Sequence, residues 1–285
     1  MAISGAGRCE AQLKSEYESS SGSSESVGLE RDADVGQDSE VFVPQYRALP
    51  NGNMVVTDPK WNEGRGCVFL CSHRGRLIAA LRGSEAGDHV GSGGVVVLTT
   101  GHFVVVSPLW GTPANSSWGR REYVGAVTWV NQDVGLHDAV SPTNSICGSK
   151  ADDEVGVGGV TALANGNYVV CSPLWNRDDM PNVGAVTWGD GNIGLMGVVG
   201  PSNSLVGGQS SDAVGSGGVL ALPNGDYVVS SPDWSNDDNT NVGAVTWVNG
   251  MCATVGSLNM KNSLLGNQAR KSCRFRCQIA ASGTE

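Results

Sequence analysis

The sequence has little charge, few histidines and no long apolar run. Charged residues make up 16% of its 285 residues, and only 4 residues are histidines. The formal net charge of −10 disfavours nucleic-acid binding, which depends on Lys and Arg neutralising phosphates. No run of about 18 apolar residues is present, so we expect no membrane span. The N-terminal stretch also has no apolar segment of the signal-peptide type.

Glycine, valine and tryptophan are abundant instead. The chain has 41 glycines and 8 tryptophans, and it contains no long stretch rich in Leu, Ala, Glu and Lys. This composition argues against a helical protein. It suits many short strands joined by tight turns, so the sequence predicts an all-β fold.

An internal repeat fills most of the chain. The motif VGAVTW stands at Val124–Trp129, Val183–Trp188 and Val242–Trp247, and a degenerate form begins at Gly66. The corresponding glycines have the numbers 66, 125, 184 and 243, so every step is 59 residues. Two further motifs recur with it: an upstream block of the type GGVTALANGNYVVCSPLW, and the short motif D-x-V-G. Such strict spacing is the signature of a tandem-repeat architecture.

The repeat divides the chain into three parts. Residues 1–33 form a Ser/Glu-rich N-terminal segment that we expect to be disordered. Residues 34–268 form the repeat domain, with copies at roughly 34–91, 92–156, 157–215 and 216–268. Residues 269–285 are a basic tail that contains cysteines.

Each copy is predicted to contain four strands. In the third copy GVTALA is the first strand, YVVCSP the second, GAVTW the third and GLMGVV the fourth, with NSLVG leading onward. The Asn-Gly pair between the first two strands predicts a type I′ hairpin turn. Four short strands per copy match a propeller blade, and neighbouring blades bury each other's faces.

The predicted fold is therefore a four-bladed or incomplete β-propeller. A β-solenoid and a β-sandwich array are the alternatives, because both also use Gly-rich turns. The segment EVFVPQY before Asn51 is a candidate for the strand that closes the ring.

The copies resemble the FG-GAP repeats of integrin-like propellers. The residues that carry the resemblance are NGDYVVSSPDW followed by VGAVTW. They are still more similar to a repeat of large bacterial surface and secreted proteins, with NGNYVV, SP-W, VGAVTW and NSLVG in order. The resemblance implies an extracellular propeller that binds proteins, in some members with Ca²⁺ in the blade loops.

Two residue types recur from copy to copy. We interpret the tryptophans as packing between blades, and they are Trp61, Trp110, Trp129, Trp175, Trp188, Trp234 and Trp247. The recurring aspartates are Asp88, Asp153 and Asp212. We interpret each as an acceptor of backbone N–H groups in a turn, with a ring of metal-binding carboxylates as the alternative.

Candidate metal ligands are sparse. Asp178 and Asp179, with Asp237 and Asp238, occupy equivalent loops and are the candidates for Ca²⁺, although the alternating acidic spacing of calcium loops is absent. Cys67 and Cys71 have zinc-like spacing. On a strand they would lie about 13 Å apart, so we expect cysteines that bind no metal.

The one long insertion is the candidate binding site. Trp110 and Val124 are 14 positions apart, whereas Trp175 and Val183 are 8 apart, so the second copy has six extra residues here. The candidate contact residues of this loop are Trp118, Arg120, Arg121 and Tyr123.

No recognisable catalytic motif is present. The histidines do not recur between copies, and we name no catalytic residue. We therefore expect a non-enzymatic binding or adhesion module that recognises a protein or a glycan at a cell surface or outside the cell. The alternatives are a propeller-type hydrolase or lyase with carboxylates in its channel, and a structural segment of a larger adhesin.

Overall fold

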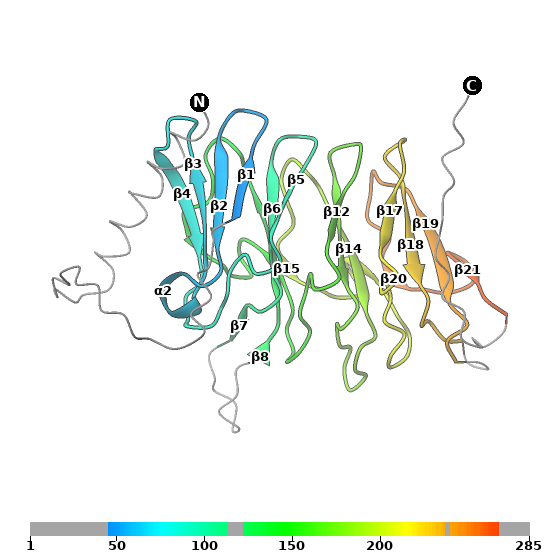
Figure 1. Ribbon diagram of the computed structural model, residues 1–285. Coiled ribbons are helices and arrows are strands. Elements are labelled where there is room, and N and C mark those ends of the chain that lie inside the picture. Colours follow the sequence, from blue (N-terminus) through cyan, green and yellow to red (C-terminus); the bar gives the residue numbers. More distant parts are fainter. Residues whose placement is uncertain (1–44, 113–121, 237–239, 268–285) are drawn as a thin grey trace, which may run out of the picture.

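The computed structural model describes residues 45–112, 122–236 and 240–267. The protein is all-β, with one sheet for each copy of the repeat, and the four sheets stand side by side in chain order (Figure 1). The predicted all-β repeat fold is therefore confirmed. No helix in the described part of the chain is long and apolar enough to cross a membrane.

The strands fall into four main sheets and one small ribbon. The first sheet contains β1 (Gln45–Ala48), β2 (Met54–Asp58), β3 (Cys67–Cys71), β4 (Leu77–Arg82) and β10 (Asp138–Ala139). The second contains β5 (Val95–Val97), β6 (Phe103–Ser107), β9 (Ala126–Val130), β11 (Ile146–Cys147) and β15 (Gly197–Val198). The third contains β12 (Val160–Ala162), β13 (Tyr168–Ser172), β14 (Ala185–Gly189), β16 (Ser204–Val206) and β20 (Gly256–Ser257). The fourth contains β17 (Val219–Ala221), β18 (Tyr227–Ser231), β19 (Ala244–Val248) and β21 (Leu264–Leu265). The ribbon joins β7 (Gly111–Thr112) to β8 (Glu122–Tyr123), and a helical turn α2 covers Trp61–Gly64.

The hairpin turns differ from the predicted type. In the third copy Leu163 and Asn167 close a loop in which Gly166 has a φ of +97°, while Asn165 keeps a negative φ. A type I′ turn needs positive φ at both central residues, so that prediction was wrong. One left-handed glycine beside the second strand is typical of a type I turn followed by a G1 bulge.

The fourth strand of each copy was also predicted wrongly. The segment NSLVG, not GLMGVV, is the fourth strand of the third copy's own sheet, because β16 pairs with β14. The GLMGVV segment contains β15, which crosses to the second sheet and pairs with β11 in parallel. In the same way β10 pairs with β4, and β20 pairs with β16. Each later copy thus donates a two-residue strand to the sheet before it.

Backbone hydrogen bonds fix these donated strands. The N–H of Val140 donates to the carbonyl of Arg82 at 3.0 Å, and Val199 donates to Cys147 at 2.9 Å. The next copy repeats the bond, with Leu258 donating to Val206 at 2.8 Å. We call the segment that carries each donated strand, residues 130–145, 189–204 or 248–263, an exchange segment.

The core lies between consecutive sheets. Between the third and fourth sheets, Val169, Val186 and Leu205 on one face meet Tyr227 and Val229 on the next, and all five are at most 2% exposed. Two similar buried clusters join the first sheet to the second and the second to the third. Because side chains alternate along a strand, an inner sheet packs one face against the sheet before it and the other face against the sheet after it. A copy is therefore stabilised largely by the copies beside it.

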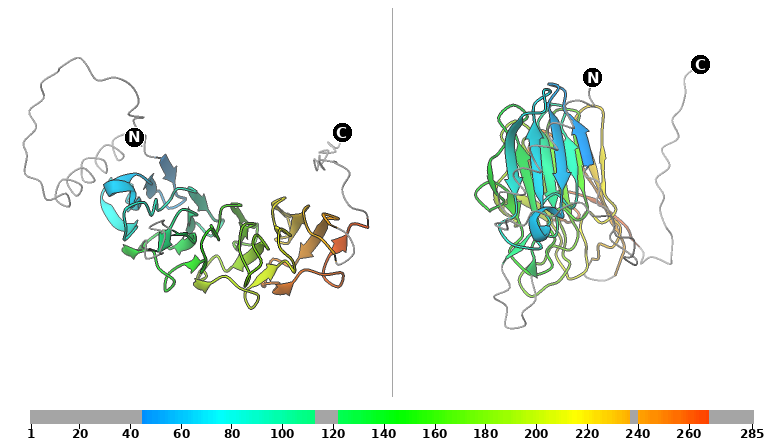
Figure 2. Two further views of the ribbon diagram at one scale, coloured as in Figure 1. Left: turned by 90° about the horizontal axis from the view of Figure 1, so that it is seen from below. Right: turned by 60° about the vertical axis from the view of Figure 1, so that its left-hand side comes forward.

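The row of sheets stays open. The first and fourth sheets lie at opposite ends of a curved array, and no strand pairs them among the described residues (Figure 2). Closure into a propeller is therefore not confirmed. The β1 strand, which overlaps the proposed closing segment, pairs with β2 as the first strand of its own copy.

Candidate binding site

The recurring aspartates are structural ties between copies, and all three are fully buried: Asp88, Asp153 and Asp212. The Oδ2 atom of Asp153 accepts the backbone N–H groups of Ser149 and Lys150, both at 2.9 Å. Its Oδ1 atom accepts the backbone N–H of Asn176 at 2.9 Å, in the loop that follows the next second strand. These bonds occupy both oxygens of the carboxylate.

Asp212 repeats this arrangement one copy later. Its oxygens accept the backbone N–H groups of Gly208, Gln209 and Ser235 at 2.8 to 3.0 Å. Burial raises the pKa of the Asp212 carboxyl, although the three N–H bonds oppose that shift. The carboxylate therefore holds two loops together rather than facing an open site.

The Thr of VGAVTW and the Asn-Ser pair form a second recurring tie. Thr128 Oγ1 and Ser145 Oγ lie 2.6 Å apart, and Ser145 Oγ donates to Asn144 Oδ1 at 2.8 Å. Asn144 Nδ2 then donates to the carbonyl of Ala139 on β10 at 2.8 Å. These conspicuous motifs thus anchor the donated strand.

The residues predicted to bind ligands are not brought together in the described structure. Trp118, Arg120 and Arg121 lie outside the described residues, and Tyr123 is half-buried on β8. Asp178 and Asp179 are exposed, while Asp237 and Asp238 lie outside the described residues. Within the described ranges no group of three His, Cys, Asp or Glu side chains could hold a metal ion.

The buried cysteines are poor nucleophiles. Burial raises the pKa of the Cys147 and Cys171 thiols to about 12, so both stay protonated near neutral pH. Cys67 is buried on β3, where Cys71 is disulfide-bonded. The Cys147 and Cys171 thiols are therefore not charged for catalysis.

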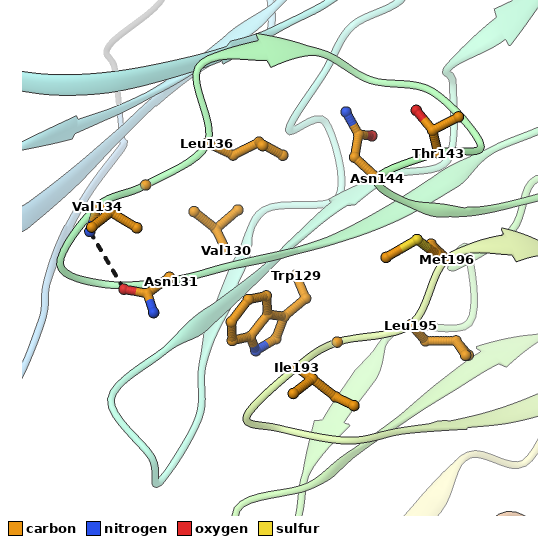
Figure 3. A pocket seen from close by; sticks show the side chains of 12 residues that line it. Trp129, Val130, Asn131, Val134, Leu136, Thr143, Asn144, Ile193, Leu195 and Met196 are labelled. Carbon is orange, nitrogen blue, oxygen red and sulfur yellow. Dashed lines mark hydrogen bonds between the residues drawn. The ribbon is translucent and has the colours of Figure 1, made fainter.

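A pocket of about 370 Å³ opens between the second and third copies (Figure 3). Two consecutive exchange segments line it, together with Trp129 of β9. Three apolar residues of its lining are unusually exposed, with Val134 at 70%, Ile193 at 73% and Met196 at 59%. Its volume lies within the range of small-ligand sites, about 300–1,000 Å³.

The indole of Trp129 is held in place beside this pocket. Its Nε1–H donates to the carbonyl of Gly191 at 3.0 Å. The ring of His102 meets it edge to face, with centroids 5.0 Å apart and an interplanar angle of 74°. A fixed aromatic ring presents apolar surface with little loss of side-chain freedom on binding.

Most polar side chains around the pocket already form hydrogen bonds within the protein. Asn131 Oδ1 accepts the backbone N–H groups of Asp133 and Val134, the second of which is drawn in Figure 3. Thr143 Oγ1 lies 2.8 Å from Ser141 Oγ, and Asn144 belongs to the tie described above. The pocket therefore offers chiefly apolar contact.

Sequence differences between copies explain the location of the pocket. Ile193, Leu195 and Met196 of the third copy correspond to Cys252, Thr254 and Val255 of the fourth, 59 residues later. At the junction of the first and second sheets a cavity holds only about 10 Å³. The sequence signal that we missed was this set of apolar residues within a Gly-rich loop.

The fold and these ties define an open, all-β tandem-repeat protein whose sheets are joined by exchanged strands. A family model described as "Repeat of unknown function (DUF5650)" matches residues 48–73, 97–157, 162–216 and 221–274, which is more than half of the chain. The chain belongs to this family. The match supports the predicted repeat and its four copies, but not an integrin-like identity. No curated protein matches the sequence.

Proposed function

We propose that the protein is a non-enzymatic binding module that takes an apolar side chain of a protein partner into the pocket between its second and third copies. The observation that carries this proposal is the exposure of Val134, Ile193 and Met196 around a pocket of about 370 Å³. Exposed apolar groups that cluster around a cavity are typical of interaction sites.

The chemistry of the pocket favours a protein over a glycan. A sugar ring needs several hydrogen-bond partners for its hydroxyl groups, and unmet polar groups are costly on binding. The indole N–H of Trp129 and the side chains of Thr143 and Asn144 already have partners within the protein. Burying one aliphatic or aromatic side chain contributes about 1.5–3 kcal/mol, so contacts outside the pocket must supply the remaining affinity.

A location at a cell surface or outside the cell is part of this proposal. It rests on the resemblance to surface-protein repeats and on the disulfide of Cys71. Disulfides persist mainly in oxidising compartments such as the extracellular space.

Selection from a phage-displayed library of random peptides tests the proposed pocket. We expect the selected peptides to share a Leu, Met, Phe or Trp residue and to lose at least about tenfold in affinity for Met196→Asp. The matched control is Val255→Asp, the equivalent exposed position of the fourth copy, which should bind the peptides normally. Selected peptides that bind Met196→Asp as tightly as the unmodified protein would overturn the proposal, as would selective binding on a glycan array.

A further inference from the structure

The face of each sheet that points toward the next copy in the chain is covered by that copy, except in the fourth sheet. On the third sheet Val186 and Leu205 are 2% and 1% exposed, because the fourth sheet packs on them. Their equivalents on the fourth sheet, Val245 and Leu264, are 44% and 79% exposed. Leu220 at 42% and Trp247 at 59% complete this apolar patch. We call the patch formed by Leu220, Val228, Ser230, Val245, Trp247 and Leu264 the terminal face.

The edge strand of the fourth sheet also lacks the partner that the equivalent strands of the other sheets have. In the first three sheets the last strand accepts a hydrogen bond from a donated strand, at the carbonyls of Arg82, Cys147 and Val206. The equivalent residue of the fourth sheet is Leu265 on β21, and no described residue donates to its carbonyl. An unpaired edge of this kind is a template for a further strand.

The recurring tryptophans show the same difference between the fourth copy and the earlier copies. The indole N–H groups of Trp129 and Trp188 donate to the carbonyls of Gly191 and Gly250 in the next copy, at 3.0 and 2.9 Å. The equivalent indole of Trp247 meets no acceptor in the described part of the chain. The hairpin side chain of Asn165 also donates to Gly250, at 2.9 Å.

The equivalent hairpin residue of the fourth copy has no such neighbour. Asn224 instead donates to Asp226 within its own turn, at 2.7 Å. The terminal face, its edge and its hairpin therefore all lack the partner that the earlier copies have.

We propose that the terminal face binds a further repeat unit of the same kind, carried by a second polypeptide. This site is separate from the pocket of the proposed function. The partner unit would present an aromatic residue and valines where the fourth copy presents Tyr227 and Val229. It would also supply a loop carbonyl to Trp247 and an exchange segment whose N–H reaches Leu265.

The charge of the terminal face and the structure of the first copy indicate which kinds of partner can bind. The terminal face contains no charged residue in a chain of net charge −10, so it repels no acidic partner. The first copy of another molecule does not fit, because its outward-facing Val56 and Phe69 are already 1% and 2% exposed. That copy also has a short turn between β3 and β4 in place of an exchange segment.

The test follows hydrogen exchange of the Trp247 indole N–H in the full chain labelled with ¹⁵N-tryptophan. The probe is an unlabelled polypeptide of residues 92–267 with Cys252→Ser and with Val245→Asp to block its own terminal face. It keeps three neighbouring copies together and presents Phe103 and Val105 where the fourth copy presents Tyr227 and Val229. A second protein carries residues 208–266, with Cys252→Ser, inserted directly after Gly266, which keeps the repeat in phase and provides a further unit at high local concentration. The Trp188 indole is the internal reference, and Val245→Asp in the receiving chain is the matched variant.

We expect the probe to slow exchange at Trp247 by at least about tenfold, toward the rate of Trp188, and Val245→Asp to abolish the effect. The inserted unit should give the same protection. Protection by the inserted unit alone would overturn the assignment to a second polypeptide. Protection in neither case, or protection of Trp247 in the unmixed chain through self-association, would overturn the proposal. None of these outcomes depends on the pocket at Met196.

Discussion

The two ends of the row of sheets present opposite faces of the repeat to the outside, and these two faces differ in how far they are exposed. In the first sheet the outer side chains Val56, Phe69 and Ala80 are at most 3% exposed. In the fourth sheet the outer side chains Val245 and Trp247 are 44% and 59% exposed. The first copy donates no strand among the described residues, whereas the fourth donates β20 but receives none. Each of the first three sheets is thus completed by the copy that follows it.

The first copy has no preceding sheet among the described residues to which it could donate a strand, and it is shorter than the later copies. Gly66 and Asp88 are 22 positions apart, against 28 between Gly125 and Asp153. The six missing residues fall in the stretch where the later copies have the exchange segment. In its place Ser72 and Arg76 close a short turn, with Ser72 N–H donating to Arg76 at 2.8 Å.

The largest expected difference between covered and open faces comes from burying a charge. Val186→Asp places a carboxylate where 2% of the side chain is exposed, so we expect a loss of about 4 kcal/mol or more in unfolding free energy. Val245→Asp, at the equivalent position of the terminal face, should cost within about 0.5 kcal/mol. Urea unfolding of both variants measures the difference, and equal losses would show that the fourth sheet is covered after all.

The donated strands should also stabilise the sheet that receives them. Leu258 follows β20, is 3% exposed and belongs to the core between the third and fourth sheets. We expect Leu258→Ala to cost about 2–4 kcal/mol through the cavity that it leaves. Leu264→Ala, at 79% exposure, should cost about 0.5 kcal/mol or less. Thermal and urea unfolding of this matched pair test the claim, which fails if Leu258→Ala is as mild as its control.

A smaller difference is expected from the indole hydrogen bond alone. Trp188→Phe keeps an aromatic ring but removes the donor to Gly250, so we expect a loss of about 1 kcal/mol. Trp247→Phe should change stability by less than about 0.5 kcal/mol, because its indole has no acceptor among the described residues. A shared loss would mean that ring packing, not the hydrogen bond, sets the cost.

Much of the local structure followed from the sequence. The buried second strand of the third copy, Tyr168–Ser172, and its partner Ala185–Gly189 were both predicted from their apolar runs. The Gly-rich motifs and the strict period indicated one sheet per copy. The recurring aspartates were interpreted as acceptors of backbone N–H groups, and Asp153 and Asp212 accept such groups in the structure.

The exchange of strands could not be read in the same way. Gly197–Val198 pairs over only two residues, too short for an alternating pattern to appear. Its partner Ile146–Cys147 belongs to another copy, and local propensity contains no information about such a pairing. Closure or openness of the row depends on the geometry between sheets, so the period alone did not decide it. The pocket was missed because its lining combines residues of two exchange segments.

Every sheet but the fourth is completed by the copy that follows it. Hydrogen exchange of the indole N–H groups of Trp129, Trp188 and Trp247, followed by NMR on the chain alone, tests it most directly. We predict slow exchange at Trp129 and Trp188, which donate to Gly191 and Gly250, and exchange at Trp247 at least about tenfold faster. Protection of Trp247 equal to that of Trp188 in the monomeric chain would contradict the account.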